Sequence, residues 1–216
     1  MSTEPPAGAA EAPRPGAAQR AEPRPAVIVD EHGIGRCSWG AADAEYRRYH
    51  DEEWGVSLHG DRPLFEKLAL EGFQAGLSWI TILRRRETFR RAFAAFDIAT
   101  VASFTDDHVE QLMADTGIIR NRAKIVATIG NARVAQGLVG PRPGALDELL
   151  WSFAPAAGRA RPTQWGEVAA ITDESTAMSA ALKALGFRFV GPTTMYALMQ
   201  STGMVDDHFT GCWRAD

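Results

Sequence analysis

Two cysteines and two histidines near opposite ends of the chain form a pattern that suits a metal ion. Cys37 and Cys212 are the only cysteines among the 216 residues, and each has a histidine nearby in the sequence, His50 and His208 respectively. Two thiolates and two imidazoles make a tetrahedral ligand set that is typical of structural zinc. A pair of buried free cysteines with unrelated surface histidines is the alternative. The pattern predicts one structural zinc ion that ties the two ends together.

A second chemical feature is an acidic side chain in an apolar helical segment. The stretch LEGFQAGLSWITIL places Glu71 among apolar neighbours and Trp79 just beyond the expected helix end. A carboxylate that is buried there needs a partner, although an exposed glutamate at the helix edge is the simpler alternative. The small residues Ala75 and Gly76 precede Leu77, so another chain could approach closely and meet an apolar tip.

A third feature is a turn between two expected helices. The stretch VEQLMADTGIIRNRAKIVATIGNA is typical of a helix, a tight turn and a second helix, with Gly117 where a left-handed residue is expected. Arg120, Arg122 and Lys124 follow in the opening turn of the second helix. Backbone N–H groups and the positive helix end could bind one phosphate there, as in a helix-hairpin-helix DNA-binding element. An ordinary helix corner closed by glycine is equally compatible.

Helices must position all of these groups, because amphipathic patterns with a helical period dominate the chain. We expect helices over residues 62–76, 79–96, 106–115, 121–135, 173–186 and 192–203. The only extended-looking stretches are AVIVD (26–30) and FRFV (187–190), and both are short. The predicted fold class is therefore all-α, a helical bundle with short connections.

Composition sets the broad class of the protein. Hydrophobic residues make up 45% and charged residues 23%, as in ordinary soluble domains. Six of the twelve prolines lie in the first 25 residues, so residues 1–34 are predicted to be a disordered tail and residues 35–216 one domain. The chain lacks a signal-peptide core and a long apolar run, and we expect a cytoplasmic protein without membrane contact. The net charge of −4 does not by itself favour nucleic acid.

Several segments resemble the DNA-3-methyladenine glycosylase I family, in that family's order and spacing. They are CSW, YRRYHDEEWGV, LFEKLALEGFQAGLSWITIL, DTGIIRNRAKI, LWSF, KALGFRFVGPTTMYALMQSTGMVDDH and HFTGC, and they run from about Arg36 to Cys212. The resemblance implies an all-helical member of the helix-hairpin-helix glycosylase superfamily. Such an enzyme hydrolyses the N-glycosidic bond of 3-methyladenine in alkylated DNA, releases the free base and leaves an abasic site. The implied partner is double-stranded DNA that contains alkylated adenine, and we expect a monomer.

The resemblance also implies roles for individual residues. The family's zinc ligands fall on Cys37, His50, His208 and Cys212, its base pocket on Trp39, Tyr49, Trp54, Glu71 and Trp79, and its DNA-probing wedge on Gln74 and Leu77. A base inside a duplex must be flipped out to be reached. Aromatic walls would then stack on the cationic alkylated purine. Glu71, the candidate catalytic residue, would accept hydrogen bonds from the adenine edge and supply negative charge.

Two departures from the superfamily pattern bear on this interpretation. The hairpin reads GIIRNR and lacks the second glycine of many helix-hairpin-helix elements, and no aspartate can be assigned to orient water. No lysine is a clear Schiff-base nucleophile, which favours a simple hydrolase over a lyase. The alternatives are a non-catalytic, zinc-stabilised helix-hairpin-helix DNA-binding protein and a purely structural helical protein. A buried Glu71 would argue against the first, and a cavity among the aromatics against the second.

Overall fold

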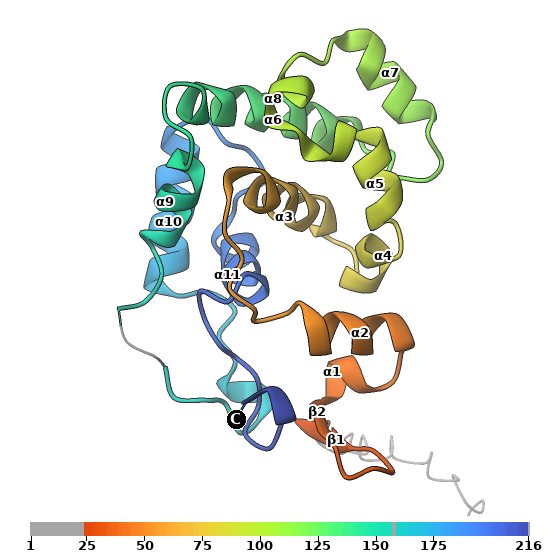
Figure 1. Ribbon diagram of the computed structural model, residues 1–216, viewed down its shortest axis with the longest axis vertical. Coiled ribbons are helices and arrows are strands. Elements are labelled where there is room, and N and C mark those ends of the chain that lie inside the picture. Colours follow the sequence, from red (N-terminus) through yellow and green to blue (C-terminus); the bar gives the residue numbers. More distant parts are fainter. Residues whose placement is uncertain (1–23, 157–158, 216) are drawn as a thin grey trace, which may run out of the picture.

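The computed structural model describes residues 24–156 and 159–215, and this part of the chain is mainly helical (Figure 1). The α-helices are α1 (Ser38–Ala41), α2 (Ala44–Glu52), α3 (Asp61–Gln74), α4 (Trp79–Leu83), α5 (Arg86–Ala92), α6 (Ile98–Ala102), α7 (Asp106–Ala114), α8 (Arg122–Val139), α9 (Ala145–Trp151), α10 (Asp173–Ala184) and α11 (Pro192–Ser201). Short 3₁₀ helices are η1 (Ala94–Phe96), η2 (Trp165–Glu167) and η3 (Trp213–Ala215), and one antiparallel pair joins β1 (Val27–Val29) and β2 (Gly35–Cys37). The prediction of a mainly helical fold is confirmed. None of the described helices is long and apolar enough to cross a bilayer.

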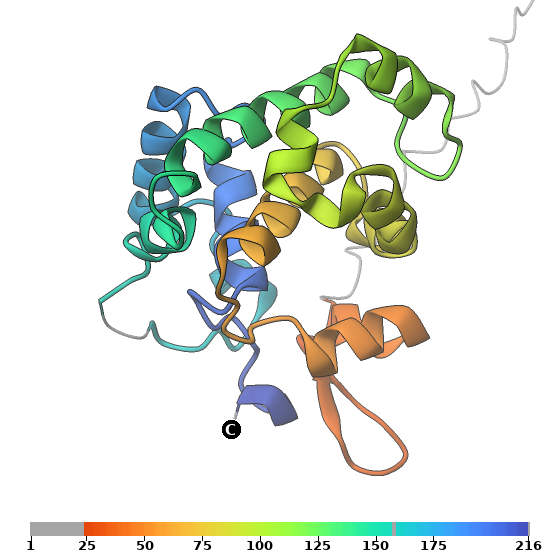
Figure 2. The ribbon, with the colours of Figure 1, turned by 45° about the horizontal axis from the view of Figure 1, so that its top comes forward.

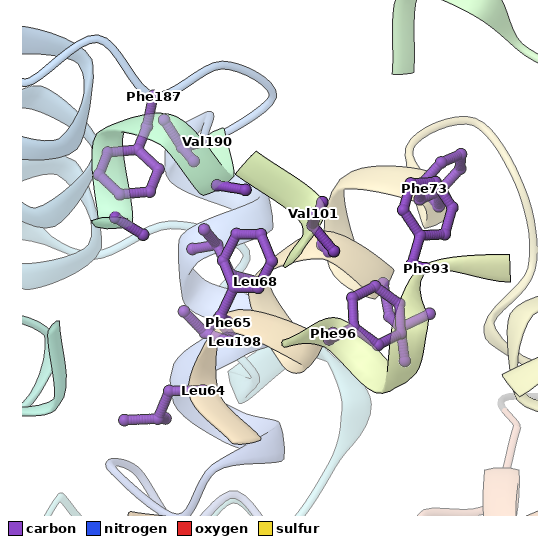
Figure 3. Packing of buried hydrophobic residues seen from close by; sticks show 14 of the residues in the cluster. Leu64, Phe65, Leu68, Phe73, Phe93, Phe96, Val101, Phe187, Val190 and Leu198 are labelled. Atoms are coloured by element: carbon purple, nitrogen blue, oxygen red, sulfur yellow. The ribbon is translucent and has the colours of Figure 1, made fainter. Parts of the chain in front are cut away.

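Helix α3 lies at the centre of the molecule. Nine of its fourteen residues are buried, which is typical of a core helix covered on most sides. Figure 1 shows α8, α9 and α10 around one side of it and α4 and α5 on the other, with α11 beneath. Leu64, Phe65 and Leu68 of α3 pack near Leu198 of α11 (Figure 3). Because α3 is held so firmly, polar side chains on the same helix have fixed positions.

The two ends of the described chain meet below this core. Figures 1 and 2 both show the C-terminal helix η3 beside the β1–β2 hairpin. Strand β1 pairs with β2 from Val27 opposite Cys37 to Val29 opposite Gly35. Strand β1 thus lies within residues 1–34, which the sequence assigned to the tail, because an apolar stretch there pairs with an antiparallel strand a few residues on. Residues 1–23 of the predicted tail lie outside the described residues.

One local prediction was wrong, and one extended-looking stretch of the sequence forms no strand. The helix expected over 79–96 is divided into α4, α5 and η1, and the first break lies beside Arg86, whose buried guanidinium pairs with Glu53 instead of packing into the core. No strand forms at 187–190, because Phe189 has a φ of 57° and Asn131 satisfies the backbone of Arg188. The helices expected at 62–76, 106–115, 121–135, 173–186 and 192–203 are confirmed, with small shifts of their ends.

Candidate active site and metal centre

An aromatic cavity of about 360 Å³ lies between α1, α2, α3, α4 and α11. All the residues predicted for the base pocket line it, namely Trp39, Tyr49, Trp54, Glu71 and Trp79. The predicted wedge residue Gln74 lines it as well. Segments far apart in the sequence thus contribute to one wall. A purely structural protein with fully packed aromatics does not fit this cavity.

The aromatic rings of the wall form edge-to-face and tilted pairs rather than parallel stacks. The ring centres of Trp39 and Trp54 are 5.0 Å apart at an interplanar angle of 76°, and those of Tyr49 and Trp79 are 5.5 Å apart at 46°. Edge-to-face and tilted pairs are stable arrangements for aromatic rings. The indole Nε1 of Trp79 is buried and finds no acceptor among the described residues. The wall therefore offers aromatic surface for stacking and one buried donor without a partner.

Glu71 is the buried carboxylate of this cavity. Its residue surface is only 4% exposed, and Oε1 accepts a hydrogen bond from Ser201 Oγ at 3.1 Å. Burial raises the pKa of Glu71 to about 7, while the positive charge of Lys67 and the Ser201 hydrogen bond act in the opposite direction. Near neutral pH the group is thus poised between its neutral and ionised forms. A bound cation would favour the ionised form.

Sequence reasoning missed Lys67 and Ser201. Lys67 lies one helical turn before Glu71 on α3, and its Nζ donates to the phenol oxygen of Tyr49 at 2.9 Å. Burial lowers the pKa of Lys67 to about 8, which the negative charges of Glu71 and Glu53 partly offset. The i, i+4 spacing of two opposite charges within an apolar helix is the signal that could have revealed it. Ser201 carried no such signal, because it comes from α11.

A second buried carboxylate, Asp207, lines another part of the cavity. Its Oδ2 accepts hydrogen bonds from the hydroxyl of Tyr196 at 2.5 Å and from Gln200 Nε2 at 2.8 Å. Gln200 and Ser201 are neighbours on α11, so this helix holds both carboxylates of the cavity, Glu71 through Ser201 and Asp207 through Gln200. Burial and Asp207 together raise the pKa of Tyr196.

The predicted wedge residue Leu77 lies on a tight turn beside the cavity. Helix α3 ends at Gln74, Gly76 adopts a φ of 81°, and the N–H of Leu77 donates to the carbonyl of Gln74 at 2.6 Å. A positive φ of this size favours glycine. The side chain of Leu77 is exposed, with 41% of its residue surface open to solvent. An exposed leucine on a fixed turn agrees with a wedge.

Lys124, predicted to contact DNA, has a different environment. It is buried, and its Nζ donates to the carbonyl oxygens of Phe73 at 2.8 Å and Ala75 at 2.6 Å. Its ammonium thereby satisfies carbonyls at the end of α3, where a helix leaves acceptors without partners. This contact holds the start of α8 against the turn that carries Leu77. Lys124 is therefore placed to join two surface segments rather than to reach a phosphate.

The other predicted residues of the hairpin between α7 and α8 differ in their environments. Gly117 does not adopt a left-handed φ, contrary to expectation, and glycine is required instead because a Cβ would lie 2.2 Å from Cγ2 of Thr88. Arg122 pairs with Glu110 through two hydrogen bonds at 2.6 and 2.8 Å. Arg120 is exposed. The hairpin thus presents arginine side chains near the Leu77 turn.

The predicted metal ligands are brought together by the structure. One ligand atom from each of Cys37, His50, His208 and Cys212 lies within 4.8 Å of the others, and all four residues are buried. Cys212 Sγ is 3.4 Å from His50 Nε2, and Cys37 Sγ is 3.7 Å from His208 Nδ1. This is a buried four-ligand set that could hold a metal ion.

The surroundings of the two histidines fit metal binding. His50 Nδ1 lies 2.7 Å from an oxygen of Asp51, and His208 Nε2 lies 3.3 Å from the carbonyl of Trp54. If these nitrogens donate, His50 Nε2 and His208 Nδ1 keep their lone pairs for the ion. Hydrogen bonding between the sulfurs raises the pKa of Cys37 and lowers that of Cys212. Two thiolates side by side need a cation, which the ion would supply.

The ligand set and the cavity share one segment of chain. Trp39 follows Cys37 by two residues, Tyr49 precedes His50 directly, and the rings of Trp54 and His208 are 4.6 Å apart. Gly55, next to Trp54, has a φ of 77°, and a Cβ there would lie 3.0 Å from His208 Nε2. The ligands therefore fix the segment that supplies three walls of the cavity.

Comparison with known proteins shows the family of this chain. The family model described as methyladenine glycosylase matches residues 39–215. The DNA-3-methyladenine glycosylase 1 of Escherichia coli is 46% identical over 180 residues, which cover 82% of this chain and 95% of that protein. The DNA-3-methyladenine glycosylase of Haemophilus influenzae is 42% identical over 187 residues, with 82% and 96% covered.

Solved structures give the same result. A crystal structure of 3-methyladenine DNA glycosylase I superposes with a TM-score of 0.79 at 42% identity and covers 82% of this chain and 98% of its own. The 3-methyladenine DNA glycosylase I of Staphylococcus aureus gives a TM-score of 0.77 at 32% identity, with 82% and 95% covered. Family model, relatives and structures each span most of the chain, and the family model covers the whole cavity together with His50, His208 and Cys212 of the ligand set. The chain belongs to the methyladenine glycosylase family.

Proposed function

We propose that this protein is a DNA-3-methyladenine glycosylase of base excision repair. It hydrolyses the N-glycosidic bond of 3-methyladenine in alkylated DNA, releases the free base and leaves an abasic site. The observation that carries the proposal is the buried carboxylate of Glu71 in an aromatic cavity, in a chain of this family. A non-catalytic DNA-binding protein would have little use for such a carboxylate, because it repels phosphates.

Recognition of the base follows from the charge of the alkylated purine. The flipped base enters the cavity, where Trp39 and Trp79 offer aromatic surface to it and Tyr49 lines the wall beside them. Stacking on these rings favours a cationic purine over neutral adenine through cation–π attraction. Glu71 accepts hydrogen bonds from the adenine edge, and its negative charge pairs with the positive charge of the base. Ordinary adenine lacks that charge and binds less well.

Cleavage of the bond requires little acid catalysis, because a cationic base is already a good leaving group. The electron pair of the bond moves onto the base, and positive charge develops on the sugar. With the cationic base bound, Glu71 is a buried negative charge, and electrostatic stabilisation is strongest away from water. Water then adds to the sugar. Lys67 is not among the residues that line the cavity and donates to Tyr49, so we propose a hydrolase without lyase activity.

Zinc is the metal we propose for the buried ligand set. Two sulfurs and two imidazole nitrogens suit its preference for tetrahedral sulfur and nitrogen coordination. A closed site of four protein ligands is structural, so the ion would supply folding energy. Cys37, His50, His208 and Cys212 would hold it and thereby fix the segment that carries the cavity walls.

For the DNA surface we propose a wedge and a neighbouring phosphate contact. Leu77, with Gln74 beside it, fills the gap that the flipped base leaves in the duplex. The hairpin with Gly117, Arg120 and Arg122 binds a phosphate next to it, as part of a helix-hairpin-helix element. Lys124 contributes indirectly, by holding the hairpin against the Leu77 turn.

The decisive experiment is an assay for free 3-methyladenine released from methylated duplex DNA by the purified protein. We expect release by the wild type and little release by Glu71→Gln at equal protein concentration. Both proteins should bind undamaged DNA with similar affinity, since phosphate contacts lie outside the cavity. DNA binding without base release by the wild type would favour the non-catalytic alternative.

A further inference from the structure

Lys67 is a buried ammonium group that no step of the proposed reaction uses. Its residue surface is only 8% exposed, and Nζ lies 4.6 Å from the ring centre of Tyr49 and 5.2 Å from that of Trp79. Both rings line the cavity, whereas Lys67 does not. A positive charge is therefore held behind two walls of the base cavity, and among residues 24–156 and 159–215 its one hydrogen bond goes to the phenol of Tyr49.

The direction of the Lys67–Tyr49 hydrogen bond is fixed by chemistry. An ammonium group has three donors and no acceptor, so the phenol oxygen must accept at the observed 2.9 Å. The phenol then has its own proton free to donate to another group. Glu71, on the same face of α3 as Lys67, stands on the cavity side with its hydrogen bond to Ser201. Tyr49 thus lies between a cation behind the wall and an anion in the cavity.

We propose that Lys67 is a positioning residue for base excision, which holds the Tyr49 phenol as a hydrogen-bond donor to the base. The proposal rests on the glycosylase function proposed above. When the bond from the sugar C1′ to the base nitrogen breaks, its electron pair moves onto the purine. Water adds to C1′ and releases a proton to solvent. No proton passes through Tyr49, which only donates a hydrogen bond.

This hydrogen bond favours the transition state over the ground state. The electron pair that moves onto the purine makes its ring nitrogens better acceptors, so a donor in the cavity binds them more strongly as the bond breaks. An ammonium that donates to the phenol oxygen polarises the O–H bond and makes it a stronger donor. Lys67 acts on the rate through Tyr49 and does not touch the base.

A double-mutant cycle tests this coupling. The measurement is the single-turnover rate of 3-methyladenine release from methylated duplex DNA by wild type, Lys67→Met, Tyr49→Phe and the double variant. We expect Lys67→Met to slow release by roughly tenfold, as for loss of a hydrogen bond to a charged group. In the double variant, the Lys67 change should add less than about twofold to the loss from Tyr49→Phe, because the partner is already gone.

Lys124→Met is the matched control. Lys124 is also a buried lysine, but its Nζ donates to the carbonyls of Phe73 and Ala75 and not to Tyr49. Lys124→Met should change the release rate by the same factor in the wild type and in the Tyr49→Phe variant. Lys67→Arg keeps both the charge and the donor-only character, so it should retain more activity than Lys67→Gln. This pair replaces the methionine variant if that variant does not fold.

Several outcomes would overturn the proposal. One is a release rate for Lys67→Met equal to that of the wild type. Another is that Lys67→Met lowers the rate by the same factor with and without Tyr49→Phe. A third is an equal loss of rate for folded Lys67→Arg and Lys67→Gln. The equal-factor outcome would assign Lys67 a general structural role. Absence of 3-methyladenine release by the wild type would refute the glycosylase function itself, whereas an active wild type with additive variants would refute only the role of Lys67.

Discussion

At the scale of single residues, the cavity is organised around charges that are costly to bury. Glu71 and Lys67 stand one turn apart on the central helix, and both have pKa values moved toward neutrality by burial. A protein retains such groups where their charge is used. The cavity has a carboxylate that could pair with a cation, and in our proposal that cation is the alkylated base.

The first prediction concerns the rate with Glu71→Gln. The change keeps the volume, removes the charge and replaces one acceptor by a donor, which faces the adenine amino group as a mismatch. An unsatisfied buried pair costs about 1–3 kcal/mol, and the lost attraction to the cation adds to that. Excision should fall by roughly tenfold to several hundredfold, at about 1.4 kcal/mol per tenfold. Single-turnover release of the base measures it, and a rate near wild type would remove Glu71 from the mechanism.

The second prediction concerns stability and pH. The pKa of Glu71 rises on folding from 4.5 to about 7, so between these values the folded state holds a proton that the unfolded state has lost. Stability therefore falls as pH rises through this window, and the full cost is present above pH 7. Glu71→Gln has no such cost.

Thermal melts at several pH values test this prediction. The variant should match wild type near pH 4.5 and melt at a higher temperature than wild type near pH 8. Glu52→Gln, at an exposed glutamate of α2, is the control for loss of one negative charge. A difference between Glu71→Gln and wild type that does not grow with pH would show that Glu71 has a partner compensating its burial.

Residue types were predictable from the sequence where they carry unusual chemistry. Cysteine is rare enough that two cysteines, each with a histidine near it, predicted the ligand set, whereas the pocket walls were implied by the resemblance to the glycosylase family. Ser201 could not be found this way, because serine is common and only the packing of α11 against α3 brings it to Glu71. Lys124 was assigned to phosphate from its basic neighbours, but its contact with the end of α3 depends on tertiary structure.

At the scale of elements, the end of α3 is where the protein meets DNA in our proposal. The helix stops at Gln74, and the chain turns through Gly76 to expose Leu77. Lys124 fixes this turn from the start of α8, and Gly117 allows the hairpin to lie close to Thr88 of α5. The wedge and the hairpin are therefore joined through Lys124.

The third prediction concerns Leu77→Ala. Its exposed side chain would fill the space of the flipped base, which offsets an unstacking cost of about a few kcal/mol in duplex DNA. A single strand has no paired stack to fill, so excision from duplex should fall several-fold more than excision from single strands. The measurement compares release rates on the two substrates. Val29→Ala on β1, another exposed aliphatic residue, should leave both rates unchanged. Equal losses for Leu77→Ala would exclude a wedge.

Elements were predictable where a helical period and end signals agreed. Helix α11 begins at Pro192 and is followed by Gly203 with a φ of 74°, as the sequence indicated. The stretch 79–96 also has a continuous apolar period, yet its helix is divided. This division could not be predicted, because the period does not show that Arg86 pairs with Glu53 across the structure. Strand β1 lies in the extended-looking stretch 26–30, but its partner β2 was missed, since three residues are too few for a reliable period.

At the scale of the whole molecule, the metal ligands connect the two ends of the described chain. Cys37 comes from β2 and His50 from α2, whereas His208 and Cys212 follow α11. In the unfolded chain these pairs are far apart, so an ion that binds all four stabilises only the folded state. The same ligands flank the aromatic walls of the cavity. Loss of the ion should therefore affect both stability and base excision.

The last prediction is that the protein contains one tightly bound zinc ion, which Cys212→Ser removes or weakens. A buried charged network that loses one partner costs about 3 kcal/mol or more. For a chain of this size, that corresponds to a melting temperature lower by roughly 6–12 °C. Elemental analysis of protein purified without chelator, together with thermal melts, measures both effects. His59→Gln, at an exposed histidine outside the ligand set, is the control and should keep the metal.

A comparison of activity with melting temperature distinguishes a structural ion from a catalytic one. If zinc acts only by holding the segment from Trp39 to Trp54, then chelation should lower excision in step with the melting temperature, and added zinc should restore both together. Stabilising the apo protein by cooling should then recover part of the activity without metal. An apo protein that keeps its wild-type melt would contradict a structural ion. Wild-type protein purified without zinc would contradict the prediction, and the ligand set would have to be explained as hydrogen-bonded side chains.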